Sequence, residues 1–225
     1  MQFDIITIFP EVFSEYFRTS IIGRAQKKGK IKIKIHNLRD FTSDKHRSVD
    51  DTPYGGGAGM VMLAEPIIKA VSKIRIKSRD KKVKVVLFSA KGKRFTQKYA
   101  VSFSKVYDQM ILICGRYEGV DERVKTILKS DEISMGPYIL TDGEIPSMLL
   151  VSAVTRLIPG VISKGSLDEE SFSDKDDRLV EYPHYTRPEV LSYKSSKYEV
   201  PKVLLSGNHA EIYKWRQEKT QLRKK

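Results

Sequence analysis

The sequence contains one cysteine (Cys114), four histidines and no apolar run long enough to cross a membrane. A single cysteine excludes an intrachain disulfide and a zinc site built from several thiolates, and it fits a reducing compartment. The histidines show no spacing typical of metal ligands, so we expect no metal site. The first residues, MQFDIITIFPEVF, lack the basic segment and cleavage site of a signal peptide. These absences predict a cytoplasmic protein without a membrane span.

The common nucleotide-binding motifs are absent as well. The glycine cluster at 55–59 is followed by Met60, whereas a P-loop ends in Gly-Lys-Ser/Thr. The cluster also follows a polar loop, whereas a dinucleotide fingerprint begins directly after a strand. Each of these glycines is explained by a backbone that needs positive φ or a close approach. No G-x-S-x-G elbow is present either, which leaves no signature of a serine hydrolase.

What the sequence does contain is an excess of positive charge. The chain has 41 Lys plus Arg against 28 Asp plus Glu, a net charge of +13. All of this excess lies in residues 1–110, and 69–105 alone carries 13 basic and one acidic side chain. Residues 168–181 are acidic, with seven acids and two basic residues. A basic block can be a solvated face, but neutralised phosphates also supply affinity for nucleic acid, so we expect 69–105 and the basic tail to contact RNA.

Short apolar, β-branched runs alternate with amphipathic stretches. The runs predict buried strands at 3–9, 31–38, 83–89 and 110–115. Helices are predicted between these strands and at 121–129 and 146–158, the last with Pro146 in its first turn. Alternating strands and helices predict an α/β fold with a mostly parallel sheet flanked by helices.

The chain divides into three parts by composition. Residues 1–162 form the predicted α/β domain, and the acidic, aperiodic stretch 163–177 is a flexible linker. Residues 178–225 form a small helical domain, in which Asn208 and Glu211 resemble a capping box that opens a basic helix. About 50 residues cannot build a large core. We therefore expect this domain to dock on another surface.

Three loops follow directly after buried strands: FSAKG at 88–92, CGRYEG at 114–119 and SMGPYILTDGE at 134–144. In open α/β sheets, ligands bind beyond the carboxyl ends of the strands. Glycines in these loops bring backbone N–H and C=O groups close to a ligand. The pattern predicts a small-molecule site here without naming its occupant.

An ordered set of motifs resembles a known family. The stretches are FPE (9–11), VDDTPYGGGAGM (49–60), ICGRYEGVDER (113–123), SMGPYILTDGEIPSM (134–148), RLIPGV (156–161), PHYTRP (183–188) and VLLSGNHAEIYKWR (203–216). They span the chain in the order found in the bacterial tRNA (guanine-N(1)-)-methyltransferase family, TrmD. The family methylates guanosine-37, the guanine 3′ of the tRNA anticodon.

The resemblance implies a trefoil-knotted fold, a homodimer with the active site at its interface, and S-adenosylmethionine as the methyl donor. It does not decide whether Mg²⁺ is a further cofactor. The residues implied to bind S-adenosylmethionine are Leu87, Ser89, Ala90, Gly115, Tyr117, Glu118, Gly119, Met135, Gly136, Pro137, Tyr138, Ile139, Leu140, Gly143 and Pro146. Leu87 and Leu140 are also explained as core residues, and Glu118 as the partner of a basic neighbour.

The resemblance also implies the catalytic residues. Guanine N1 is protonated at neutral pH and needs a base, while negative charge develops on O6 as the proton leaves. Arg156 is placed at O6, and Glu170, directly before Ser171-Phe172, is the base, supplied by the other subunit. Taken alone, Arg156 is a cation at a helix C-terminus and Glu170 is one acid among seven in a linker.

The chain departs from the usual family pattern at several positions. Glu170 replaces a usual aspartate, and Asp168 stands two residues upstream as a rival base. Pro137 replaces a usual acidic residue, and Asp142 a usual glycine. The C-terminal domain is expected to be shorter than usual. The alternative function is a non-catalytic RNA-binding protein on the same scaffold.

Overall fold

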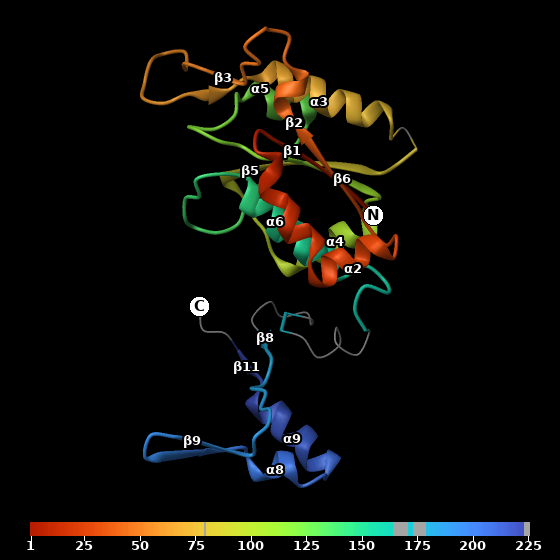
Figure 1. The fold of residues 1–225 in the computed structure, drawn as a ribbon, viewed down its shortest axis with the longest axis vertical. Coiled ribbons are helices and arrows are strands. Elements are labelled where there is room, and N and C mark those ends of the chain that lie inside the picture. Colours follow the sequence, from red (N-terminus) through yellow and green to blue (C-terminus); the bar gives the residue numbers. More distant parts are fainter. Residues whose placement is uncertain (79, 164–170, 173–178, 223–225) are drawn as a thin grey trace. The chain divides into compact units, whose positions relative to one another are not determined.

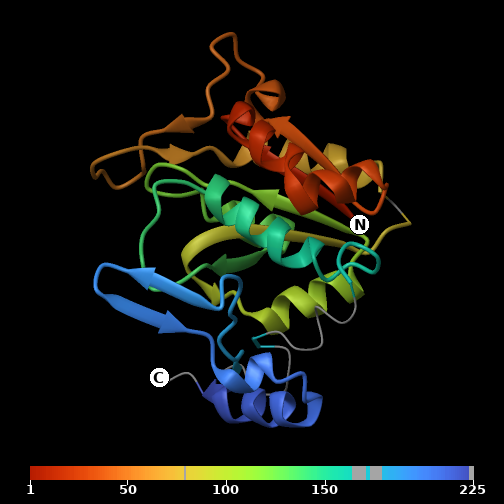
Figure 2. The same ribbon diagram turned by 60° about the horizontal axis from the view of Figure 1, so that its bottom comes forward.

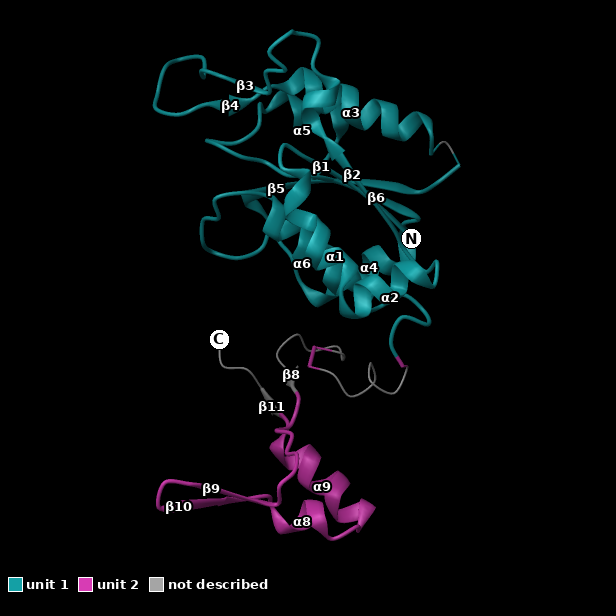
Figure 3. Cartoon of the chain, in the orientation of Figure 1, with its two compact units in different colours: residues 1–162 teal, residues 163–225 magenta. Residues whose placement is uncertain are grey.

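A computed structural model of the chain describes residues 1–78, 80–163, 171–172 and 179–222. The chain divides into two compact units, Met1–Ile162 and Ser163–Lys225 (Figure 3). The first unit contains the largest sheet of the protein, and the second unit contains shorter strand pairs.

The centre of the first unit is a parallel sheet of five strands in the order β2-β1-β6-β5-β7. Its strands are β1 (Gln2–Thr7), β2 (Lys32–Asn37), β5 (Val83–Arg94), β6 (Gln109–Ile113) and β7 (Asp131–Ser134). Every residue of the central strand β6 is buried. Parallel strands covered on both faces must be apolar on both sides, which is why MILI and VKVVLF are nearly continuous apolar runs.

Helices cover both faces of this sheet (Figures 1 and 2). One core cluster joins Phe3 and Ile5 of β1 to α4 (Gln97–Val106) and α6 (Glu144–Thr155), together with α1 (Ser14–Arg18) and α2 (Ser20–Lys27). The other cluster joins Ile6 and Ile8 to α3 (Ala64–Ile76) and α5 (Arg123–Leu128). Successive side chains of a strand point to opposite faces, so one strand serves both cores. Two short 3₁₀ helices, η1 (Pro10–Phe13) and η2 (Leu38–Phe41), follow β1 and β2.

The glycine cluster lies in a loop between two short paired strands, β3 (Asp50–Asp51) and β4 (Val61–Met62). Gly55, Gly56, Gly57 and Gly59 all have positive φ, from 79° to 122°. A Cβ on Gly59 would lie 2.6 Å from Oε1 of Glu118, but that side chain is exposed and can move aside, so the requirement for glycine here is the positive φ. Positive φ is the backbone requirement expected from the sequence.

The predicted α/β architecture is confirmed for residues 1–162, including the four predicted strands and the helices at α3, α5 and α6. Strand β7 was not predicted, because its sequence, DEIS, begins with two acids and is too short to show alternation. It pairs with β5 at Val86–Phe88 and again at Lys93–Arg94, across an irregularity in β5. This second pairing extends β5 well past the predicted end at residue 89.

The second unit contains two helices and two strand pairs among its described residues. The elements are β8 (Leu179–Val180), β9 (Val190–Tyr193), β10 (Ser196–Glu199), α8 (Lys202–Leu205), α9 (His209–Lys219) and β11 (Gln221–Leu222). Oδ1 of Asn208 accepts hydrogen bonds from the backbone N–H groups of Ala210 and Glu211, so Asn208 caps α9 as predicted. The β9–β10 hairpin was not predicted. No described residue between 181 and 220 is buried, so this part has little core of its own.

Candidate functional site

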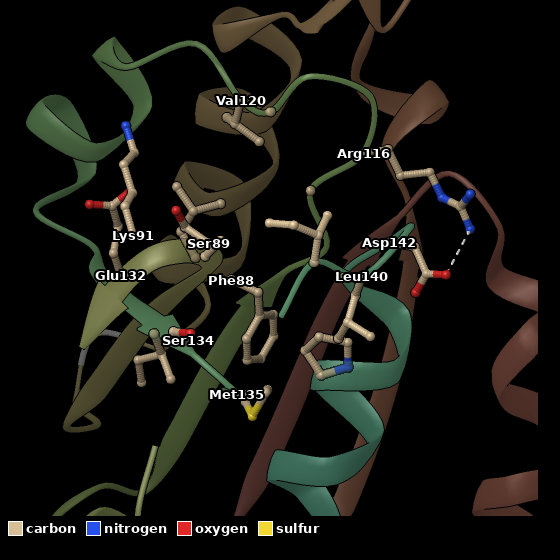
Figure 4. A pocket seen from close by; sticks show the side chains of 18 of the residues that line it. Phe88, Ser89, Lys91, Arg116, Val120, Glu132, Ser134, Met135, Leu140 and Asp142 are labelled. Carbon is tan, nitrogen blue, oxygen red and sulfur yellow. Dashed lines mark ion pairs between the residues drawn. The ribbon is translucent and has the colours of Figure 1, made fainter. Parts of the chain in front are cut away.

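A cavity of about 520 Å³ lies beside the irregular part of β5 and beyond the carboxyl ends of β6 and β7. Its walls come from residues 87–91 of β5, from 115–122 and from 132–146, with Lys125 of α5. The stretch 88–92, predicted as a loop after a strand, is part of β5. Figure 4 shows side chains from these segments converging on one space. The size is typical of a small-molecule site, and the position is where ligands of parallel α/β sheets bind.

Close backbone packing holds these loops together. A Cβ on Gly143 would lie 2.6 Å from Cα of Cys114, so the segment that begins α6 touches the end of β6. Gly92 is packed equally closely against the backbone of Glu132, with a Cβ position 2.6 Å from its carbonyl carbon. Only glycine allows these approaches. The cavity is therefore built on contacts between segments that are far apart in sequence.

Local hydrogen bonds fix the loop after β7. The Oγ of Ser134 donates to the carbonyl oxygen of Gly136 at 3.0 Å and accepts from its N–H at 3.3 Å. The hydroxyl of Tyr138 donates to the carbonyl oxygen of Met135 at 3.2 Å. These bonds turn the chain back over the cavity. Ser134 also lines the cavity, which the sequence did not predict.

A charged cluster forms one side of the cavity. The guanidinium of Arg116 lies 3.8 Å from Oδ2 of Asp142 (Figure 4). It also lies 3.4 Å from Oε2 of Glu144 and stacks over the ring of Phe9 at 4.3 Å. Glu144 is fully buried, and its other oxygen, Oε1, accepts a 2.6 Å hydrogen bond from the hydroxyl of Thr7. One cation is thus shared between two carboxylates.

The two carboxyl groups have opposite pKa shifts. Burial raises the pKa of Glu144, and the hydrogen bond from Thr7 and the charge of Arg116 offset this only in part. Burial also pushes the pKa of Asp142 upward, but hydrogen bonds from the N–H of Ile145 and from Thr141, with the charge of Arg116, outweigh it. The pKa of Asp142 is therefore lowered, and Asp142 is ionised at neutral pH.

On the opposite side, lysines pair with the carboxylates of the cavity. Nζ of Lys91 lies 2.9 Å from Oε2 of Glu122, and Nζ of Lys125 lies 2.5 Å from Oε2 of Glu132. The sequence predicted none of these four residues as part of the site. Lys91 and Glu122 are 31 positions apart, so no local motif joins them.

Thirteen of the fifteen residues predicted to bind the cofactor line this cavity. Gly136 and Pro137 belong to the same loop but are not part of the lining. Their roles, like those of the other thirteen, stay predictions. The lining residues that sequence reasoning missed are Phe88, Lys91, Arg116, Val120, Glu122, Lys125, Glu132, Ile133, Ser134, Thr141 and Asp142. Arg116 and Asp142 lie inside two of the family motifs, next to residues that were predicted to bind the cofactor.

Of the predicted catalytic residues, only Arg156 lies among the described residues, and it does not line the cavity. Arg156 directly follows α6, whereas Gly143 and Pro146, at the start of that helix, line the cavity. Twelve helical residues lie between these ends, which corresponds to about 18 Å. Glu170 and Asp168 lie outside the described residues. Ser171 belongs to the same Glu-Ser-Phe motif as Glu170, and its Oγ accepts a 2.9 Å hydrogen bond from the N–H of Glu181.

Cys114 is a small buried side chain, as predicted. Its Sγ lies 3.1 Å from Oγ of Ser147, and burial raises the pKa of the thiol well above its usual value. Within the described part of the chain, no group of three histidine, cysteine, aspartate or glutamate residues is placed to hold a metal ion. None of the described helices has the length and apolar character needed to span a membrane.

A parallel α/β sheet with a ligand-sized cavity beyond its carboxyl edge is typical of the class of ligand-binding α/β proteins. The family within that class follows from comparison with known proteins. The chain belongs to the family described as tRNA (Guanine-1)-methyltransferase TrmD, whose model matches residues 1–225. The resemblance predicted from the ordered motifs is confirmed.

Curated relatives share this family over nearly the full chain. A protein of Pelotomaculum thermopropionicum is 49% identical over 224 residues, which cover 99% of this chain and 86% of the relative. One of Dictyoglomus turgidum is 53% identical over 217 residues, or 96% of this chain and 83% of the relative. One of Caldicellulosiruptor saccharolyticus is 48% identical over 216 residues, or 96% and 84%. All three are named tRNA (guanine-N(1)-)-methyltransferase.

Proposed function

We propose that this protein is an S-adenosylmethionine-dependent methyltransferase that modifies N1 of guanosine-37 in tRNA, in the cytoplasm. The observation that carries the proposal is the family match over residues 1–225, joined to a cavity built from the loops that the family motifs indicate. A non-catalytic RNA-binding protein would have no reason to keep a cavity of this size and lining.

The lining fits the proposed cofactor. Apolar side chains, among them Leu87, Phe88, Met135 and Leu140, suit an adenine ring, and loop backbone offers N–H and C=O groups for its polar edge. The cofactor supplies a methyl group bound to a positively charged sulfur. The residues of the cavity hold and orient it and exclude water from its reactive end.

The chemistry at guanine requires two further groups. The carboxylate of Glu170 accepts the N1 proton, with Asp168 as the rival base, so that N1 can attack the methyl carbon. The guanidinium of Arg156 donates to O6, where negative charge develops, and lowers the barrier. Both assignments rest on the family resemblance.

The position of Arg156 supports an active site shared between two copies of the chain. An arginine side chain is too short to reach back about 18 Å along α6 to the cavity of its own chain. The same helix carries an apolar groove of about 470 Å³, lined by Tyr16, Ile145, Met148, Leu149, Ser152 and Ala153. Ile145 is 54% exposed and Leu149 41% exposed. A second copy seated on this groove would cover the patch and bring another chain beside the cavity.

The chain path near the cavity supports the trefoil knot that the family resemblance implies. After β7 joins the edge of the sheet beside β5, the chain returns through 134–143 and packs Gly143 against the backbone of Cys114 at the end of β6. We propose that this return passage is the threaded segment. The close approach of Gly143 to β6 is what a tight threading requires.

The proposed tRNA-binding surface consists of basic residues, but it includes only part of the predicted block at 69–105. The block at 69–105 does not form one patch, because α3 and α4 pack in different cores on opposite faces of the sheet. Lys84 is also not available for phosphate, since its Nζ lies 2.5 Å from Oδ2 of Asp131. We propose that the exposed lysines around Lys81, together with the basic helix α9, contact the tRNA backbone.

The direct test measures methyl transfer from labelled cofactor to two tRNA transcripts that differ only in carrying guanosine or adenosine at position 37. We expect incorporation with guanosine alone, as 1-methylguanosine on nucleoside analysis. Parallel reactions with Mg²⁺ and with a chelator decide whether Mg²⁺ is a further cofactor. Binding of tRNA without binding of the cofactor would contradict the proposed function and favour the non-catalytic alternative. Binding of both without transfer would contradict the proposed methyl transfer.

A further inference from the structure

The balance of charge around the cavity singles out one residue. Four carboxylates line the cavity: Glu118, Glu122, Glu132 and Asp142. Glu122 and Glu132 each pair with a lysine of the lining, and Glu118 is exposed to solvent. Asp142 is different, because its side chain is only 13% exposed and it shares the guanidinium of Arg116 with Glu144.

Arg116 lies closer to Glu144 than to Asp142, at 3.4 Å against 3.8 Å. With both carboxylates ionised, the three side chains carry a net charge of −1. The excess negative charge therefore lies in a partly buried part of the cavity wall, where solvent screens it less than at the surface.

The backbone keeps Asp142 in place. Its Oδ1 accepts hydrogen bonds from the N–H groups of Glu144 and Ile145, at 3.0 Å and 3.2 Å, at the start of α6. The hydroxyl of Thr141 donates to Oδ2 at 3.0 Å. The carboxylate therefore has a fixed orientation in the wall. An asparagine can keep the Oδ1 acceptor and the shape without the charge.

The charge of a methyl donor changes during the reaction. Methyl transfer leaves the bonding electron pair on sulfur, so the product carries one positive charge fewer than S-adenosylmethionine. We propose that Asp142 is a specificity-determining residue whose carboxylate favours the cationic donor over the neutral product, S-adenosylhomocysteine. This inference rests on the proposed function and deepens it, because it assigns to Asp142 the discrimination between substrate and product.

The expected effect is modest but measurable. The interaction between two unit charges about 8 Å apart changes an affinity by roughly 2- to 30-fold when the effective dielectric constant is about 80 to 20. Removing the charge of Asp142 should therefore weaken binding of the cationic donor by about fivefold. Binding of the neutral product should stay within about twofold of its original value.

Titration calorimetry on the full-length protein tests this with three ligands: S-adenosylmethionine, S-adenosylhomocysteine and sinefungin, a cationic analogue with an amine in place of the methylsulfonium. The variants are Asp142→Asn and the matched control Asp121→Asn. Asp121 also accepts a helix-start N–H, from Arg123, and pairs with that arginine, but it does not line the cavity. Thermal unfolding shows whether each variant remains folded.

We expect Asp142→Asn to weaken binding of S-adenosylmethionine and of sinefungin to the same extent, and to leave binding of S-adenosylhomocysteine unchanged. Asp121→Asn should leave the ratios between the three affinities unchanged. Equal weakening of all three ligands by Asp142→Asn would mean a purely structural role and overturn the inference. The inference would also be overturned if Asp142→Asn left the ratio of donor affinity to product affinity unchanged, or if Asp121→Asn changed that ratio as much as Asp142→Asn. A wild-type protein that binds none of the three would overturn the proposed function together with the inference.

Discussion

Gly143 lies directly against Cys114: a Cβ atom on Gly143 would come within 2.6 Å of Cα of Cys114 and 2.7 Å of the backbone N of Gly115. The contact joins the start of α6 to the end of β6, and both segments line the cavity or border it. Gly143 has φ of −94°, so it is required by space and not by backbone conformation.

Gly143→Ala should therefore disturb the cavity. The backbone atoms facing the new methyl group cannot move aside as a side chain could, so we expect a loss of about 1–3 kcal/mol in the free energy of unfolding. Cofactor affinity should fall in parallel. Denaturant unfolding and calorimetry measure both effects. Gly115→Ala is the control for the loss of stability alone, because Gly115 lines the cavity, while its nearest side-chain neighbour, Cγ2 of Val120, is 3.4 Å from the added Cβ. An equal loss in the free energy of unfolding in both variants would contradict the steric account.

The buried carboxyl group of Glu144 should make stability depend on pH. Its pKa in the folded protein is raised above the ordinary value of 4.5, mainly by burial. The stability it contributes is therefore fully present below that ordinary value and is lost as pH rises through the raised pKa. Relative to wild type, Glu144→Gln should gain stability as the pH rises from about 4 to neutral.

Urea unfolding of both proteins across this pH range measures the difference. Glu122→Gln provides a control of opposite sign, because its hydrogen bond and ion pair with Lys91 lower the pKa of Glu122. Its effect should be small, since the side chain is exposed to solvent. A flat difference between Glu144→Gln and wild type would show that the pKa of Glu144 is not raised.

Glu170 is the predicted base, so Glu170→Gln should lower the rate of methyl transfer by about 10²–10⁴ while leaving cofactor and tRNA affinities unchanged. Asp168→Asn tests the rival base, and Glu169→Gln is the matched control within the same acidic stretch. Single-turnover kinetics separate the chemical step from binding. If Asp168→Asn causes the larger loss, the assignment to Glu170 is wrong.

The lysines at 81 and 82 should contribute to tRNA binding by neutralising phosphates. Neither forms an ion pair with a described residue, unlike Lys84. Lys81→Glu with Lys82→Glu should weaken tRNA binding and reduce the slope of log affinity against log salt by roughly 0.7–0.9 for each phosphate that is no longer neutralised. Lys27→Glu with Lys28→Glu is the control, an exposed lysine pair outside the basic block. An unchanged slope would mean that residues 81 and 82 are only a solvated surface.

Much of the first unit could be predicted because its strands are buried on both faces. Short, β-branched apolar runs such as MILI favour central strands, and the segments that follow them line the cavity. Strand β7 was missed because only two of its residues are buried, and its place beside β5 depends on pairing with a distant segment.

The charged network around Arg116 was missed for a different reason. Arg116 and Asp142 are 26 positions apart, and Thr7 lies near the other end of the domain. Their contacts arise only when the sheet brings three loops to one edge. The same holds for the basic block, which is continuous in sequence but divided between the two faces of the sheet.

Whether two chains complete one active site is the central question, because Arg156 stands at the far end of α6 from the cavity of its own chain. The most direct test combines two inactive variants, Glu170→Gln and Arg156→Ala, on differently tagged chains and measures methyl transfer by the purified heterodimer. If base and cation come from different subunits, one of the two sites is intact and activity returns. No activity in a verified heterodimer would contradict this arrangement, since both residues would then act from one chain or Glu170 would not be the base.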